Sequence, residues 1–88
     1  MTKEKIEKTL RKTFQVRHLE VIDDSHLHAG HVEALTQGGG HFHLLIVAKD
    51  FEGKKPVERH RMIYAALKDL KPQIHALGIQ ALTPQEKK

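Results

Sequence analysis

The sequence predicts a single α+β domain over residues 1–88, in which helices cover one face of a three-stranded mixed sheet. Two observations predict this class. Helical and strand periodicities follow one another along the chain in the order helix, strand, strand, helix, strand. The second predicted helix is also long enough to carry the chain across the sheet, so the last strand can run parallel to its neighbour.

The N-terminal part of this pattern is a helix followed by a strand. Residues 3–14 have apolar side chains at every fourth position, which predicts a short helix with one narrow apolar stripe. This stripe consists of Ile6, Leu10 and Phe14. In residues 17–23, Leu19 and Val21 alternate with residues of the opposite face, which is typical of a half-buried strand.

Two further strands are predicted later in the chain. Residues 41–49 are apolar and β-branched enough for a central strand, and residues 74–82 alternate again. The segment between the first two strands, residues 24–40, is too long for a tight hairpin. Because loops of this length inside a small domain are often functional, this segment is a first place to expect a site.

The second helix is predicted by the residues that begin and end it. Phe51 and Gly53 indicate a turn, and we expect both residues to be structural. Pro56 suits the first turn of a helix, which should continue to about Leu70 and end before Pro72. At about 100° per residue, the buried arc of this helix is expected to contain His60, Ile63, Tyr64, Leu67 and Leu70.

The run Arg59-His60-Arg61 lies inside this helix, and two interpretations of it are open. His60 lies on the apolar arc, which favours a buried structural histidine between two solvent-facing arginines. Alternatively, Arg59 and Arg61 form a basic surface for nucleic acid or an acidic partner, together with Lys54 and Lys55 in the preceding turn. Such a surface would bind through phosphates, and its binding would therefore depend on salt.

The composition excludes several classes of function. The chain has no cysteine, so it cannot form disulfides, use a thiolate nucleophile or hold a four-cysteine iron–sulfur cluster by itself. It has no phosphate loop and no His-Glu-x-x-His motif, and we expect no enzyme. Without a long apolar run or a signal peptide at the N-terminus, we expect a cytoplasmic protein. The net charge of +4 permits nucleic-acid binding without requiring it.

Eight histidines are the main chemical clue. The segment HLHAGH contains His26, His28 and His31, while His41 and His43 lie two apart and so share one face of the central strand. Imidazole nitrogens suit zinc, copper or iron, although a histidine taken singly is more often structural. An iron–sulfur centre here would need sulfur from another molecule, with histidines as the ligands of this chain.

Three stretches of the chain resemble the BolA family. They are LEVIDDSHLHAGH at 19–31, HFHLLIVAKDFEGKKPVERHRMIYAAL at 41–67 and IHALGIQALTP at 74–84. The first stretch is most similar to the branch with a histidine-bearing loop. The resemblance implies a fold similar to the type II KH domain, with a helix-turn-helix-like segment from Phe51 to Leu70. The turn GKKP lacks the Gly-x-x-Gly clamp of nucleic-acid-binding KH domains, so RNA binding is not implied.

The resemblance also implies two functions. The first is a partnership with a monothiol glutaredoxin, in which the two proteins share a glutathione-ligated 2Fe–2S cluster for cluster trafficking and iron regulation. The family's ligand positions then fall on His28 and His75, with His26 and His31 as alternates, and the isolated chain is expected to bind no cofactor. The second is a DNA-binding transcriptional regulator of stress response and cell shape, acting through the basic surface described above. Alone, the chain is expected to be a monomer or a weak homodimer.

Overall fold

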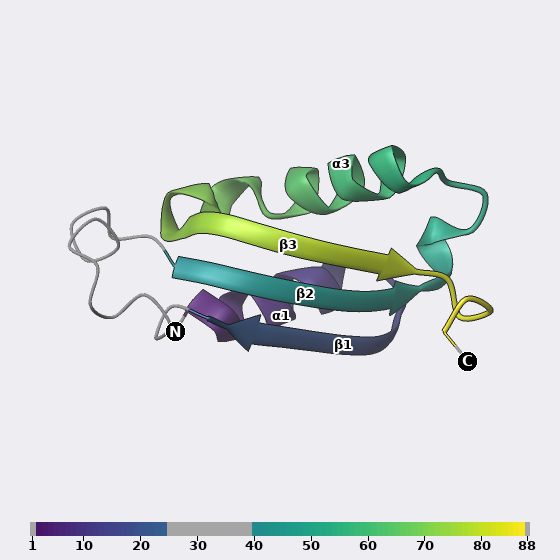
Figure 1. Ribbon diagram of the computed structural model, residues 1–88, viewed down its shortest axis with the longest axis horizontal. Helices are drawn as coiled ribbons and strands as arrows, with labels where there is room; N and C mark the ends of the chain where they lie inside the picture. The colour runs from purple at the N-terminus through teal and green to yellow at the C-terminus, as the bar shows by residue number, and fades with distance from the viewer. Residues whose placement is uncertain (1, 25–39, 88) are drawn as a thin grey trace.

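The computed structural model describes residues 2–24 and 40–87 of the 88-residue chain. Its strands form one sheet in the order β1-β2-β3, and helices α1 and α3 pack against one face of that sheet (Figure 1). This arrangement confirms the predicted α+β class and the three-stranded sheet. None of the described helices is both long and apolar enough to span a lipid bilayer.

Helix α1 (Thr2–Thr13) forms where the spacing of apolar residues predicts it. Ile6 and Leu10 are fully buried, and Phe14 is buried just after the helix ends. An acidic residue lies in the first turn and two basic residues lie in the last, so both ends complement the helix dipole.

The sheet is mixed, as predicted. Strand β1 (Val16–Asp23) runs antiparallel to the central strand β2 (Gly40–Ala48), and β3 (Ile74–Leu82) runs parallel to β2. Leu19 and Val21 point into the core, while Glu20 between them is exposed. The alternation seen in the sequence therefore assigned the buried face of β1 correctly.

The connection from β2 to β3 begins with the 3-10 helix η2 (Lys49–Phe51) and a turn at Gly53. Gly53 has a φ of 76°, a conformation that favours a residue without a Cβ atom. Helix α3 (Pro56–Ala66) then starts with proline in its first turn, and Glu58 Oε1 accepts a hydrogen bond of 2.9 Å from the backbone N–H of Lys55. The predicted turn and helix start are both confirmed.

The end of α3 differs from the prediction. The α-helix stops at Ala66, and a 3-10 helix, η3 (Lys68–Gln73), follows instead of a continuous helix to Leu70. Pro72 lies inside η3 and disfavours the α conformation at the residue before it. Tighter 3-10 turns therefore lead the chain into β3.

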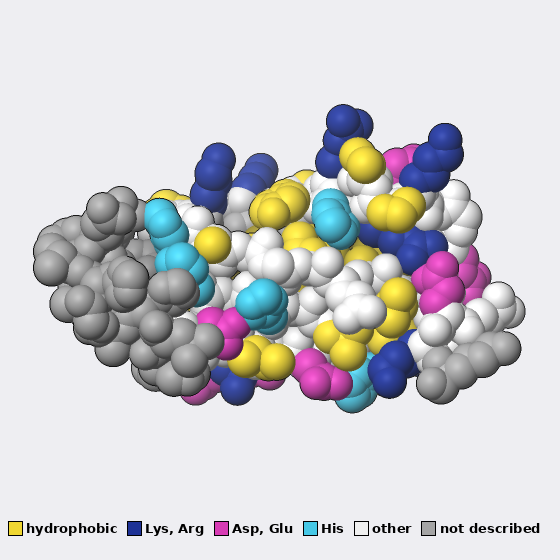
Figure 2. Space-filling view, in the orientation of Figure 1, with side chains coloured by type: hydrophobic (Ala, Val, Ile, Leu, Met, Phe, Trp, Pro, Cys, Tyr) yellow, Lys and Arg dark blue, Asp and Glu magenta, His cyan; other side chains and the backbone are white. Residues whose placement is uncertain are grey.

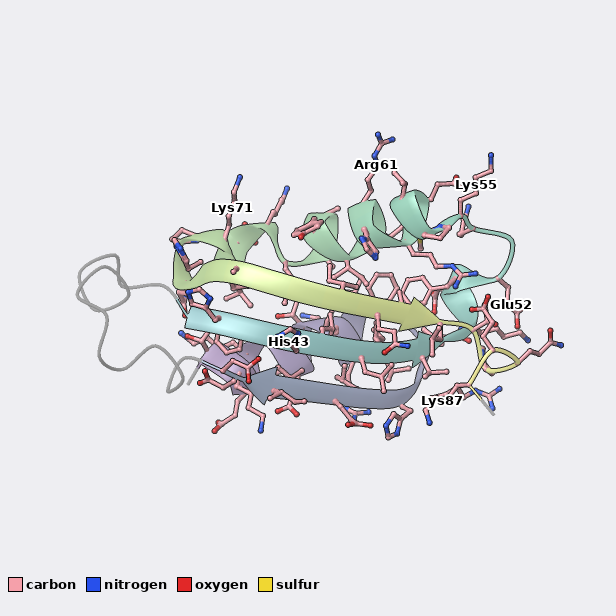
Figure 3. All side chains as sticks on the ribbon, viewed as in Figure 1. His43, Glu52, Lys55, Arg61, Lys71 and Lys87 are labelled. Carbon is pink, nitrogen blue, oxygen red and sulfur yellow. The ribbon has the colours of Figure 1, made fainter. Side chains whose placement is uncertain are left out.

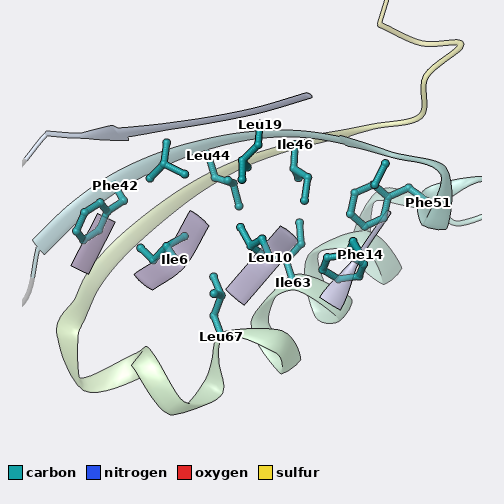
Figure 4. Packing of buried hydrophobic residues seen from close by; sticks show 12 residues of the cluster. Ile6, Leu10, Phe14, Leu19, Phe42, Leu44, Ile46, Phe51, Ile63 and Leu67 are labelled. Carbon is teal, nitrogen blue, oxygen red and sulfur yellow. The ribbon is translucent and has the colours of Figure 1, made fainter. Parts of the chain in front are cut away.

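The hydrophobic core lies between the sheet and the helices, and Figure 4 shows its side chains from close by. Ile6 and Leu10 of α1 share this core with Ile63 of α3, and all three are fully buried. Phe51 is also fully buried, with its ring centroid 5.3 Å from that of Phe14. This burial gives Phe51 the structural role expected from the sequence.

The buried side of α3 is rotated from the predicted arc. Ile63 and Leu67 are buried as expected, but Tyr64 is 53% exposed and His60 is only half-buried. Arg59 is 9% exposed and forms the start of the inner stripe. The prediction that Arg59 faces solvent was wrong. It assumed that a charged side chain in the helix lies on the exposed side, whereas Arg59 is buried.

Candidate functional site

The predicted metal ligands fall in two parts of the chain. His26, His28 and His31 lie outside the described residues. His75, the second residue of β3, is described, and its side chain is exposed. Since β3 is an edge strand of the sheet, His75 is open to another molecule from that side.

A β-bulge determines the position of His75. Gly40 pairs with Ile74 and His41 pairs with Ala76, so β3 contains one residue, His75, that has no partner across the ladder. A bulge bends the strand locally and redirects the side chain of the extra residue. It also shifts the alternation of β3, so that Ile74 and Leu77, three residues apart, both pack against the core.

The bulge brings His75 beside His41. The two imidazole centroids are 4.9 Å apart, and the ring planes are tilted by 46°. His41 is half-buried on the central strand, and its backbone carbonyl accepts a hydrogen bond of 2.7 Å from the N–H of Asp24. The sequence placed His41 with His43 on one strand face but gave no reason to expect the contact across strands.

His43 has a different set of neighbours. Its Nε2 atom lies 2.8 Å from Asp24 Oδ2, and its ring lies over Gly78 of the adjacent strand. A Cβ atom at Gly78 would come within 2.7 Å of His43 Nδ1, so the ring occupies this position because residue 78 is glycine. Asp24 thus holds His43 through its side chain and His41 through its backbone.

A shallow groove of about 490 Å³ lies next to His75, between α3 with η3 and the first half of β3. Its rim includes two exposed lysines, Lys68 and Lys71, and its floor is mainly apolar. In Figure 2, histidine side chains are visible along the sheet, with lysine and arginine side chains above them on the helical side. A ligand at this edge would meet both imidazole and ammonium groups.

The described residues do not form a complete metal site. Within residues 2–24 and 40–87, no group of three or more histidine and acidic side chains lies close enough to hold a metal ion. A cluster or metal at His75 therefore needs ligands from solvent, from another molecule or from outside the described ranges.

The predicted basic surface is present, but it is smaller than expected. Lys54, Lys55 and Arg61 are exposed, and Figure 3 shows Lys55 and Arg61 pointing away from the sheet. Val57 and Tyr64 are exposed on the same helix, 61% and 53%, and are spaced by four and three residues from Arg61. The outer side of α3 therefore presents a mixed basic and apolar stripe.

Arg59 belongs to the inside of the molecule. Its Nε atom donates to the carbonyl of Lys54 at 2.9 Å, and Nη1 donates to the carbonyl of Ala81 at 3.0 Å. The same Nη1 forms an ion pair of 2.6 Å with Glu86 Oε1. The guanidinium is thus used to join α3 to the end of β3, and Arg59 is removed from the predicted contact surface.

Glu86 completes this connection, which we call the Arg59–Glu86 clasp. The backbone N–H of Thr83 donates to Glu86 Oε1 at 2.8 Å, and the N–H of Glu86 donates to Thr83 Oγ1 at 3.3 Å. The hydrogen bond from Arg59, followed by that from Thr83, lowers the pKa of Glu86 from 4.5 to about 2. The Thr-x-x-Glu spacing of a capping box is visible in the sequence and could have predicted the second half of this arrangement.

Comparison with known proteins identifies the family. The BolA-like protein family model matches residues 10–86. The chain is 47% identical over 87 residues to SufE-like protein 1, chloroplastic/mitochondrial, of Arabidopsis thaliana, which covers 93% of this chain but 24% of that protein. It is 39% identical over 87 residues to the DNA-binding transcriptional regulator BolA of Escherichia coli (strain K12), covering 98% of this chain and 79% of that protein.

A solved structure agrees with these matches. The BolA domain of SufE1 from Arabidopsis thaliana superimposes with a TM-score of 0.80 at 45% sequence identity, and the match covers 96% of this chain and 93% of that one. The chain spans about a quarter of the length of SufE-like protein 1, so the match to that protein concerns one part of it. From the family model and these relatives together, the chain belongs to the BolA-like protein family.

Proposed function

We propose that the chain is a non-enzymatic adaptor that partners a monothiol glutaredoxin and shares a glutathione-ligated 2Fe–2S cluster with it. The observation that carries the proposal is His75, an exposed imidazole on a bulge of an edge strand, in a chain without cysteine. A neutral imidazole in this position can ligate iron from one side while a partner supplies sulfur from the other.

The donor set fits a shared cluster better than a cluster held by this chain alone. His75 provides one nitrogen, and in this proposal His28 provides the second, with His26 and His31 as alternates. Glutathione and the glutaredoxin then supply the two sulfur ligands. When bound, the cluster would supply iron and sulfide for delivery to other proteins or an iron-dependent signal.

A second function, DNA-binding transcriptional regulation, is supported by a different surface. Lys54 and Lys55 project from the turn before α3, and Arg61 projects from the middle of that helix. The Escherichia coli relative carries that function in its name. The proposal no longer includes Arg59. The type II KH-like and helix-turn-helix-like arrangements remain part of this second proposal.

Co-purification tests the adaptor function. The chain is expressed with a monothiol glutaredoxin and purified anaerobically with iron and glutathione, and visible absorption and circular dichroism are recorded. We expect a cluster spectrum that differs from that of glutaredoxin alone and that disappears in His75→Ala but persists in His18→Ala. His18 is a suitable control because it is also exposed but lies on β1, at the other edge of the sheet. An unchanged spectrum in His75→Ala would refute the ligand assignment.

Salt-dependent DNA binding tests the second function. If α3 contacts phosphates, affinity falls steeply as salt rises, and Arg61→Glu weakens binding to all sequences by a similar factor. Binding that survives Arg61→Glu with the same salt dependence would show that this surface does not contact DNA.

A further inference from the structure

We propose that His41 and His75 form a two-imidazole site that binds one transition-metal cation, such as Zn²⁺ or Cu²⁺, in the chain alone. The two residues come from adjacent strands, and their rings are already in contact, with centroids 4.9 Å apart. The site needs no glutaredoxin, and it gives His41 a role that the cluster proposal does not include.

The ring separation matches that of two histidines bound to one ion. A metal about 2.1 Å from an imidazole nitrogen lies about 3.2 Å from the ring centroid. Two rings on the same ion, at angles of about 90° to 110°, therefore have centroids about 4.5 to 5.2 Å apart. The observed 4.9 Å falls inside this range. The observed centroid distance is therefore compatible with both rings binding one ion.

The backbone keeps the two histidines close. His41 lies on the central strand, where the hydrogen bond from Asp24 to its carbonyl holds the strand end. His75 is the extra residue of the bulge, which bends the strand locally and redirects this side chain. Both backbone positions are thus set before a metal arrives, which reduces the entropy lost on binding.

The chemistry of the site selects its ligand. Two neutral nitrogen donors favour borderline cations such as Zn²⁺ and Cu²⁺ over Mg²⁺ or Ca²⁺, which prefer oxygen. Among residues 2–24 and 40–87, no group of three or more histidine and acidic side chains could hold a metal ion, and His75 is exposed. Water or an added chelator therefore fills the remaining positions on the ion.

The test uses Cu²⁺ capped by nitrilotriacetate, a complex that leaves room for two imidazoles on one ion. The isolated chain is titrated, and the electron paramagnetic resonance spectrum reports how many imidazole nitrogens bind copper. Because His26, His28 and His31 also carry imidazoles that can bind copper, the titration is made in a background in which all three are replaced by glutamine. We expect one capped ion per chain, bound through two nitrogens.

Single substitutions in that background decide the outcome. His41→Gln and His75→Gln should each lower the affinity at least about tenfold and reduce the nitrogen count to one, because the second ligand of a chelate acts intramolecularly. His18→Gln and His43→Gln should leave both readouts unchanged. His75→Gln alters an exposed side chain, so it provides a test even if His41→Gln disturbs folding. Two-nitrogen binding that survives His75→Gln, or no such binding in the background chain, would overturn the proposal.

Discussion

The two ends of β3 use polar side chains in opposite ways. At its start, His75 stands exposed on a bulge, with lysines on the rim of the groove beside it. Just beyond its end, Arg59 and Glu86 bond to each other and to backbone groups, and Arg59 is nearly inaccessible. At one end the polar groups are exposed to solvent, whereas at the other they hold helix and strand together.

The contrast shows that residue type alone does not distinguish a contact surface from an internal connection. Arg59 and Arg61 are two residues apart on one helix, yet Arg59 is enclosed and Arg61 is exposed. A difference of two residues, about 200° around a helix, is enough to change the role of a guanidinium. The predictions below test this contrast between the two ends.

The largest effect is expected from Arg59→Ala. This substitution removes the donors to the carbonyls of Lys54 and Ala81 and leaves Glu86 without its cation. Because two backbone carbonyls lose their donor, the free energy of unfolding should fall by about 1–3 kcal/mol, measured by urea denaturation. Arg61→Ala is the matched control and should change it by less than about 0.5 kcal/mol. Equal losses in the two variants would show that the clasp contributes no more than a surface arginine.

A smaller effect is expected from acid. Folding lowers the pKa of Glu86 from 4.5 to about 2. The clasp therefore contributes stability that is fully present above pH 4.5 and is lost as the pH falls toward 2. Urea midpoints measured at pH 6 and at pH 2.5 should therefore differ more in the wild type than in Glu86→Gln. If the two proteins lose stability equally, the carboxylate of Glu86 does not carry this pH dependence.

Gly78→Ala, in the middle of β3, should destabilise the fold less than Arg59→Ala. The new methyl group displaces the ring of His43 and weakens its pair with Asp24, at a cost of about 1 kcal/mol. In a His43→Ala background the methyl group meets no ring, and the same change should be neutral or stabilising by up to about 1 kcal/mol. A double-mutant cycle measures this coupling, and additive effects would contradict the packing of His43 on Gly78.

His75→Ala should have the smallest effect on folding. Its side chain is exposed, so the free energy of unfolding should change by less than about 0.5 kcal/mol while cluster sharing is lost. Thermal denaturation of the purified chain checks the first part. A large loss of stability would mean that His75 is a structural residue. A missing cluster spectrum in His75→Ala would then result from unfolding and not from the loss of a ligand.

Much of the fold could be predicted because its signals are local. The spacing of Ile6 and Leu10, the alternation of Leu19 and Val21, and the position of Pro56 each determine an element from a few neighbouring residues. The rotation of α3 could not be assigned in this way. A buried arginine satisfied by distant carbonyls looks the same in sequence as an exposed one.

The candidate site was predicted only in part, for a similar reason. His75 was predicted as a ligand from the family resemblance. Its contact with His41 depends on the register between β2 and β3. A bulge changes that register by one residue, and no periodicity in a single strand reveals it. A strict alternation over residues 74–82 would place His75 on the face of Leu77 and Ile79, which pack against the core, whereas His75 is exposed.

The bulge has a further consequence for how this chain meets other proteins. An edge strand offers unpaired N–H and C=O groups to any passing strand, and this is a common route to aggregation. At the start of β3 the extra residue interrupts the regular spacing of those groups and places a titratable ring beside them. A partner that docks there has to recognise a side chain instead of extending the sheet. At the start of β3, the bulge therefore favours selective association over indiscriminate strand addition.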